Sequence, residues 1–150
     1  MASESTPLLA LLELPLLKPT SAETIQGHVT ALRASFISGA MRPLAARKAQ
    51  LRAIRALVED GCEILQAAMW KDLHKHAAET FVTETSSVLL EVQDHLDNLD
   101  DWAAPHKVGT NLLNLPGSSY IRSDPLGVAC IMDTWNYPIM LLLMPLIGAI

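Results

Sequence analysis

The sequence predicts an α/β fold in which an amino-terminal helical layer leads into strands. Two observations predict this fold. Apolar residues recur at helical intervals through residues 21–104, and the periodicity is lost after Pro105, where turn-forming residues gather. An almost wholly apolar run, residues 127–132, then has the composition of a strand covered on both faces, as in a parallel or mixed sheet, and a helical segment follows it.

The first two helices have recognisable starts and stops. Thr20 begins a capping-box spacing ahead of a helix expected over residues 21–38, and Gly39 closes that helix. Pro43 suits the first turn of the next helix, whose apolar residues keep a helical step until Gly61. Both segments are therefore expected to be amphipathic helices that begin and end at these residues.

Two further helices and two strands complete the expected order. A third helix is predicted over residues 62–73, with Lys71, Asp72 and Lys75 toward water. A fourth and longer one is predicted over residues 77–103, because the apolar residues keep the helical step. Residues 120–123 and 127–132 are then expected to be strands separated by a turn.

The chain divides into a short extension and one larger unit. Residues 1–20 are expected to be a flexible amino-terminal extension, since their Leu-rich stretch lacks the basic start of a signal peptide. The larger unit comprises helices over residues 21–104, a loop and strands over 105–132, and a motif and helix over 133–150. That last run is apolar and has no polar cap, so we expect Ile150 to be a truncation point.

Composition excludes some classes of partner. A net charge of -5 and a pI near 5.4 argue against nucleic acid as a partner, because binding it needs a clustered excess of Lys and Arg.

The two cysteines, Cys62 and Cys130, form no disulfide framework and suit a reducing, cytoplasmic compartment, where both are expected to pack rather than react. His74 and His76 are expected at the surface without a metal, because no thiol or carboxylate ligand is partnered with them.

Asn136 is the candidate functional residue that the chain itself suggests. It follows the apolar strand, and an amide donor fixed at a strand end can stabilise an oxyanion. A second interpretation is structural: Asn136 caps a helix that begins near Tyr137, with Pro138 in its first turn. Both interpretations stay open at the level of the residues.

The sequence resembles the aldehyde dehydrogenase superfamily, most closely its fatty aldehyde dehydrogenase branch, over about residues 31–150. A weaker part of the likeness is the block Asp72, Leu73, His74 and Lys75, with Trp102 and Ala103. The likeness is strongest in ordered blocks: Pro125, Leu126 and Gly127, then Trp135, Asn136, Tyr137 and Pro138, then Pro145, Leu146, Ile147, Gly148 and Ala149.

This resemblance implies an enzyme that oxidises aldehydes to carboxylic acids with NAD or NADP. In such enzymes a cysteine thiolate attacks the aldehyde, an Asn amide holds the alkoxide, a hydride passes to the cofactor, and a Glu-activated water releases the acid. By the resemblance, Asn136 takes the role of the oxyanion donor and Tyr137 borders the aldehyde channel. The nicotinamide side of the cofactor cleft would include Ile131, Met132, Thr134 and Trp135.

The resemblance also sets limits. In the family the nucleophilic cysteine, the Glu and the glycine-containing cofactor loop lie beyond the position of Ile150, so this chain is expected to be inactive alone. Asp133 stands where relatives usually have Gly, and its charge would repel a cofactor phosphate. A homodimer is a family expectation.

Two other hypotheses remain. One is a non-catalytic truncated subunit or interaction module that pairs with full-length enzyme through residues 120–123. The other is a membrane-associated helical protein that uses the Leu-rich start and the apolar end of the chain.

Overall fold

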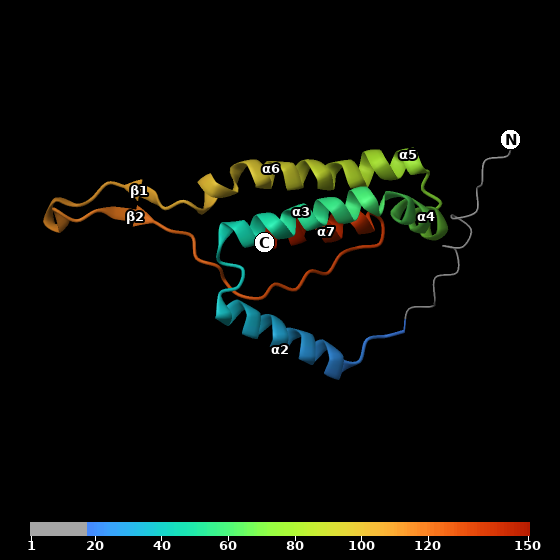
Figure 1. Cartoon of the computed structure of the whole chain (residues 1–150), viewed down its shortest axis with the longest axis horizontal. Helices are drawn as coiled ribbons and strands as arrows, with labels where there is room; N and C mark the ends of the chain where they lie inside the picture. The colour runs from blue at the N-terminus through green and yellow to red at the C-terminus, as the bar shows by residue number, and fades with distance from the viewer. Residues whose placement is uncertain (1–17) are drawn as a thin grey trace.

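The computed structural model describes residues 18–150, and helices dominate it (Figure 1). The predicted helical layer that leads into strands is confirmed. The elements in order are α2 (Ala22–Ser38), α3 (Leu44–Asp60), α4 (Cys62–Leu73), α5 (Ala77–Thr80), the π-helix η2 (Phe81–Thr85), α6 (Ser86–Ala103), β1 (His106–Val108), the 3-10 helix η3 (Leu112–Asn114), β2 (Ser119–Ile121) and α7 (Pro138–Ala149).

The core lies where α3, α6 and α7 pack side by side (Figure 1). Leu51 and Val58 of α3 meet Val88 and Val92 of α6, and Ile147 of α7 joins them; each of the five is at most 1% exposed. Complete burial of such a side chain stabilises the fold by about 1.5–3 kcal/mol. Leu51 and Val58 are seven residues apart and Val88 and Val92 are four apart, which is the spacing of one face of a helix.

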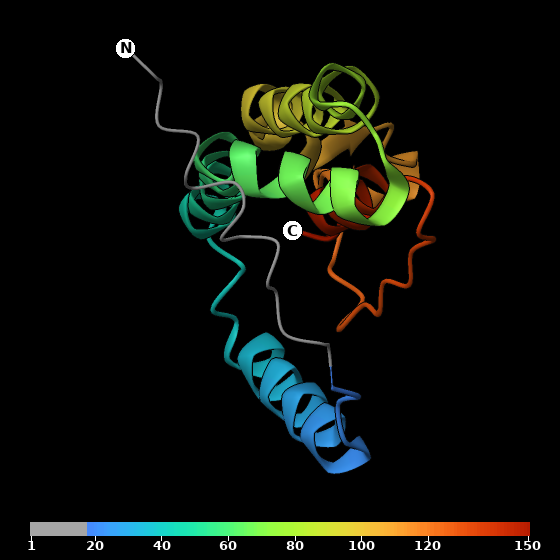
Figure 2. The same cartoon turned by 90° about the vertical axis from the view of Figure 1, so that its right-hand side faces the viewer.

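Helix α2 stands apart from this body (Figure 2) and buries none of its residues. Gly39 ends it in the left-handed conformation, with φ 73°, and donates its backbone N–H to the carbonyl of Phe36 at 3.0 Å. The amino-terminal cap is Ser21, whose hydroxyl accepts from the N–H of Thr24 at 3.2 Å. The capping box expected to begin at Thr20 is thus one residue early, because the helix begins at Ala22.

The predicted fourth helix is found as three consecutive elements, α5, η2 and α6. Thr80, Glu84 and Val88 are spaced by four residues, and in a regular α-helix each such step overshoots a turn by about 40°. The wider π-helical turn fits an extra residue at this point and brings both Glu84 and Thr85 to the buried side. The π-helix therefore decides which side chains this helix presents to its neighbours.

The sheet consists of one antiparallel pair, β1 and β2, in which His106 faces Ile121 and Lys107 faces Tyr120. This hairpin projects from one end of the helical body (Figure 1). The strand expected over residues 120–123 is present, one residue earlier and shorter. The strand β1 was expected to be loop, because its three residues have no apolar alternation and only their pairing with β2 defines them.

The strand predicted over residues 127–132 is wrong. This segment has no hydrogen-bonded neighbour among the described residues, and a strand exists only through such a ladder. Its side chains are mostly exposed rather than covered on both faces, with Met132 at 90%. Cys130 is exposed as well, so the expected packing role for this thiol is also wrong.

The amino-terminal extension expected over residues 1–20 lies, up to residue 17, outside the described residues. Helix α7 matches the expected apolar helix and is 12 residues long. No helix within residues 18–150 combines the length and the hydropathy needed to cross a membrane.

Candidate functional site

The amino-terminal end of α7 is capped from a distant part of the chain. Tyr137 occupies the N-cap position, but its side chain makes no hydrogen bond to the helix. Pro138, at the first helical position, has no N–H. The next two amides, of Ile139 and Met140, donate to Oε2 of Glu84 at 2.8 and 3.4 Å. A carboxylate here accepts hydrogen bonds from otherwise unpaired N–H groups, and its negative charge interacts favourably with the positive end of the helix dipole. Glu84 of η2 is therefore the cap of α7.

Glu84 is a fully buried acid, and its partner is Lys75 in the connection between α4 and α5. The Nζ of Lys75 lies 2.7 Å from Oε1 of Glu84, and the two side chains are 11% and 0% exposed. Burial of an isolated charge is strongly unfavourable, whereas here Oε1 accepts from the Lys75 ammonium and Oε2 accepts from backbone amides of α7. Lys75, expected to point toward water, instead points into the molecule.

Lys75 also contacts the turn that carries the candidate amide. Its Nζ donates to the backbone carbonyl of Asn136 at 2.8 Å and lies 3.9 Å from the centroid of the Tyr137 ring. An ammonium has three donors and is attracted to the face of an aromatic ring. One side chain thus joins Glu84, Asn136 and Tyr137.

The Asn136 side chain is exposed and held by one neighbour. The hydroxyl of Thr134 donates to Oδ1 of Asn136 at 2.5 Å, so the amide oxygen is occupied. Across residues 18–150, the Nδ2 group of Asn136 has no hydrogen-bond acceptor, and it is a free donor on the surface. The interpretation of Asn136 as a helix cap is wrong, because it precedes the capping residue and Glu84 binds the amides of α7.

The other predicted site residues lie along the extended segment before α7. Met132 and Trp135 are 90% and 84% exposed, and Tyr137 is 36% exposed. Ile131 is half-buried, and Thr134 binds the Asn136 side chain. The structure thus brings Thr134, Asn136 and Tyr137 together. The assignment of these residues to a cofactor cleft and an aldehyde channel stays a prediction.

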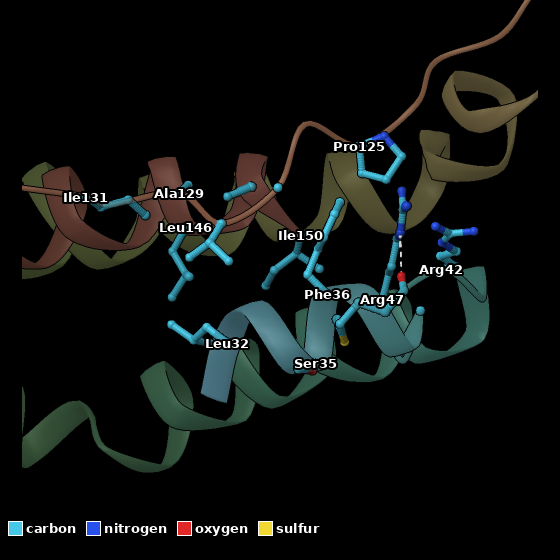
Figure 3. Close-up of a pocket in the computed structure, with 15 residues that line it drawn as sticks. Leu32, Ser35, Phe36, Arg42, Arg47, Pro125, Ala129, Ile131, Leu146 and Ile150 are labelled. Carbon is cyan, nitrogen blue, oxygen red and sulfur yellow. Dashed lines mark hydrogen bonds between the residues drawn. The ribbon is translucent and has the colours of Figure 1, made fainter. Parts of the chain in front are cut away.

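A separate apolar cavity of about 310 Å³ lies between α2 and α7 (Figure 3). Leu32 and Phe36 of α2 line one side, and Ile131, Leu146 and Ile150 line the other. Arg47 lies at one end, where its Nε donates to the carbonyl of Met41 at 2.9 Å. Neither Asn136 nor Tyr137 borders this cavity.

Sequence reasoning missed Glu84. The available signal was a charged residue four positions from both Thr80 and Val88, on the inward side of a helix. His74 and His76 are exposed as expected, but they do not share a helix. His74 ends α4 with φ 53°, and Nδ1 of His76 accepts from the N–H of Ala78 at 3.2 Å.

Comparison with known proteins gives a consistent result. The model of the aldehyde dehydrogenase family matches residues 17–150. The chain is 39% identical over 126 residues to aldehyde dehydrogenase family 3 member A2 of Macaca fascicularis, covering 84% of this chain and 26% of that protein. It is 41% identical over 119 residues to aldehyde dehydrogenase family 3 comG of Dictyostelium discoideum, covering 79% of this chain and 25% of that protein.

A solved structure is similar as well. The substrate-bound state of AldH from Staphylococcus aureus superposes with a TM-score of 0.80 at 29% sequence identity, over 83% of this chain and 27% of that one. The chain thus spans about a quarter of the length of the curated relatives that it matches.

Proposed function

Because this chain belongs to the aldehyde dehydrogenase family, we propose that it supplies the amino-terminal part of an NAD(P)-dependent enzyme that oxidises aldehydes to carboxylic acids. In this proposal the chain contributes the oxyanion donor, and a carboxyl-terminal remainder contributes the nucleophile. Neither cysteine of this chain suits that role: within residues 18–150, the hydrogen bond to the Cys62 thiol comes from the amide of Gln66 and not from a base, and the Cys130 thiol makes no hydrogen bond or ion pair. The chain alone is expected to be inactive.

The observation that carries the proposal is the free amide donor of Asn136. Its Oδ1 is bound by Thr134, so Nδ2 is the group left to donate to an incoming oxygen. When a nucleophile adds to an aldehyde, the carbonyl oxygen becomes an alkoxide, and a positioned N–H stabilises that charge more than the neutral aldehyde. Loss of one such donor typically costs about 10²- to 10³-fold in kcat.

The segment before α7 offers a mixed fit to a dinucleotide. The exposed side chains of Met132 and Trp135 present apolar surface suited to a flat ring, and Ile131 and Thr134 lie in the same segment. The exposed carboxylate of Asp133 does not suit a phosphate. NAD or NADP, when bound, accepts the hydride from the substrate carbon. We propose that these residues face its nicotinamide side, with phosphate contacts supplied elsewhere.

The wider setting is also part of the proposal. The thiol of Cys130 is exposed and unpaired, which suits the reducing cytoplasm. Tyr137, stacked on Lys75, would border the path of the aldehyde. The assembly is proposed to be a homodimer, as in the family expectation.

The test joins residues 1–150 to the carboxyl-terminal three quarters of the macaque relative and follows reduction of NAD and of NADP after aldehyde is added. We expect activity from the joined protein and none from the chain alone. Asn136→Ala should lower kcat by about 10²- to 10³-fold. Asn114→Ala, at an exposed position in η3, is the matched control and should leave kcat unchanged. An unchanged kcat in Asn136→Ala would refute the assigned role.

A second candidate function rests on the projecting hairpin. Tyr120 and Ile121 of β2 are 61% and 62% exposed, and no third strand within residues 18–150 pairs with either edge of the sheet. Such a surface favours an interaction module that pairs with full-length subunits. Mixing the chain with full-length relative and measuring mass by light scattering tests it: a mixed species lost in Ile121→Asp supports pairing, and separate species exclude it.

A further inference from the structure

We propose that Lys75 and Glu84 together form a positioning device that holds the turn of Asn136 against α7 and so aims its amide. This inference rests on the proposed role of Asn136 as oxyanion donor. In this inference both are positioning residues, because Lys75 binds the Asn136 backbone and Glu84 binds Lys75 and the amides that follow Asn136.

The contacts fix the turn at successive points. Glu84 binds the amides of Ile139 and Met140 in the first turn of α7. Lys75 binds the carbonyl of Asn136 and covers the ring of Tyr137. The remaining residue between them is Pro138, whose ring fixes its φ angle. The backbone from the carbonyl of Asn136 to the first turn of α7 is therefore held by one ion pair.

The chemistry of the pair also indicates positioning rather than stability. Burying an acid and an ammonium together is often no more stabilising than an apolar pair of similar volume. What the charged pair adds is direction, because hydrogen bonds require defined angles and an apolar contact does not. Glu84 reaches the end of α7 from a π-helical turn, a local irregularity that is frequent at functional sites.

The first experiment measures backbone order by NMR relaxation on the 150-residue chain, with no activity required. In the parent chain, Asn136 and Tyr137 should be rigid, with order parameters of about 0.85. In Lys75→Met, these values should fall toward about 0.6, which is typical of a flexible segment. The matched control is Lys48→Met, which removes another lysine from an ion pair with Asp100 and should leave the turn rigid.

A second variant guards against loss of folding. Lys75→Met leaves the buried carboxylate of Glu84 without a counter-charge, whereas the double variant Lys75→Met with Glu84→Gln removes both charges and keeps an acceptor for Ile139. The double variant should fold and still show the mobile turn. A turn that stays rigid in the folded double variant, or one that is already mobile in the parent chain, would overturn the inference.

The joined enzyme supplies the functional readout. Lys75→Met should lower kcat by about 10- to 100-fold while the KM for the cofactor is unchanged, since small misplacements of a catalytic group have effects of this size. In an Asn136→Ala background the same substitution should have no further effect. An equal loss in both backgrounds would show that Lys75 acts otherwise. A rigid-to-mobile change by NMR together with an Asn136→Ala enzyme of full activity would keep the positioning contact and reject the proposed function.

Discussion

Replacement of Glu84 by alanine tests the capping of α7 most directly. The substitution removes the acceptor of two backbone amides, at 2.8 and 3.4 Å, and the counter-charge of Lys75 at 2.7 Å. Loss of a helix cap costs about 0.5–2 kcal/mol, and the breaking of a buried ion pair costs about 3–5 kcal/mol. The two costs sum to about 3.5–7 kcal/mol, and because the Lys75 side chain is 11% exposed and so partly solvated, we expect a total near the lower end, at about 3.5 kcal/mol.

Urea unfolding followed by circular dichroism measures this change. With a slope of about 1–3 kcal/mol per molar urea, the midpoint should fall by at least about 1 M. Glu84→Gln keeps an acceptor for Ile139 and should fall between the parent and the alanine variant. Glu79→Ala, at an exposed position in the adjoining helix α5, should stay within about 0.5 kcal/mol of the parent. Equal midpoints for Glu84→Ala and Glu79→Ala would refute the capping role.

Two further predictions concern glycine and cysteine. Gly39→Ala should destabilise the end of α2 by about 1 kcal/mol, because φ is 73° and the added Cβ meets Arg42 at 3.2 Å. Gly27→Ala, where the added Cβ meets nothing within 4 Å, should stabilise the same helix by about 0.5–1 kcal/mol. Hydrogen exchange of the α2 amides measures both changes in stability. If both substitutions stabilised α2, or both destabilised it, the reasoning would be contradicted. A thiol-specific reagent followed by mass spectrometry should modify exposed Cys130 before half-buried Cys62, and the reverse order would contradict the placement of Cys130.

Some elements were readable from the residues because their determinants are local. The third helix lies over residues 62–73 as predicted, and the second ends at Gly61 as predicted. Helix hydrogen bonds join residues four apart, so spacing, proline and glycine carry most of the needed information. The motif around Asn136 was also identified from the sequence, through its likeness to a known family.

Other features depended on distant partners. The apolar composition of residues 127–132 indicates a strand, but a strand requires a hydrogen-bonded neighbour, and the described residues supply none. The residues of β1 show no pattern that predicts a strand, and only their pairing with β2 makes this segment a strand. Local composition does not determine which segments pair in the folded chain.

The sequence by itself determined the helical layer, the faces that form its core and the candidate amide. Only the tertiary structure decided how that amide is held, because the contacts that hold it join residues far apart in the chain. Glu84 lies 55 residues before the Ile139 amide that it caps, and Lys75 lies 61 residues before Asn136. Periodicity marks Glu84 as an inward-facing charge, but only packing brings it to the end of α7, where its carboxylate meets both an ammonium and a helix dipole.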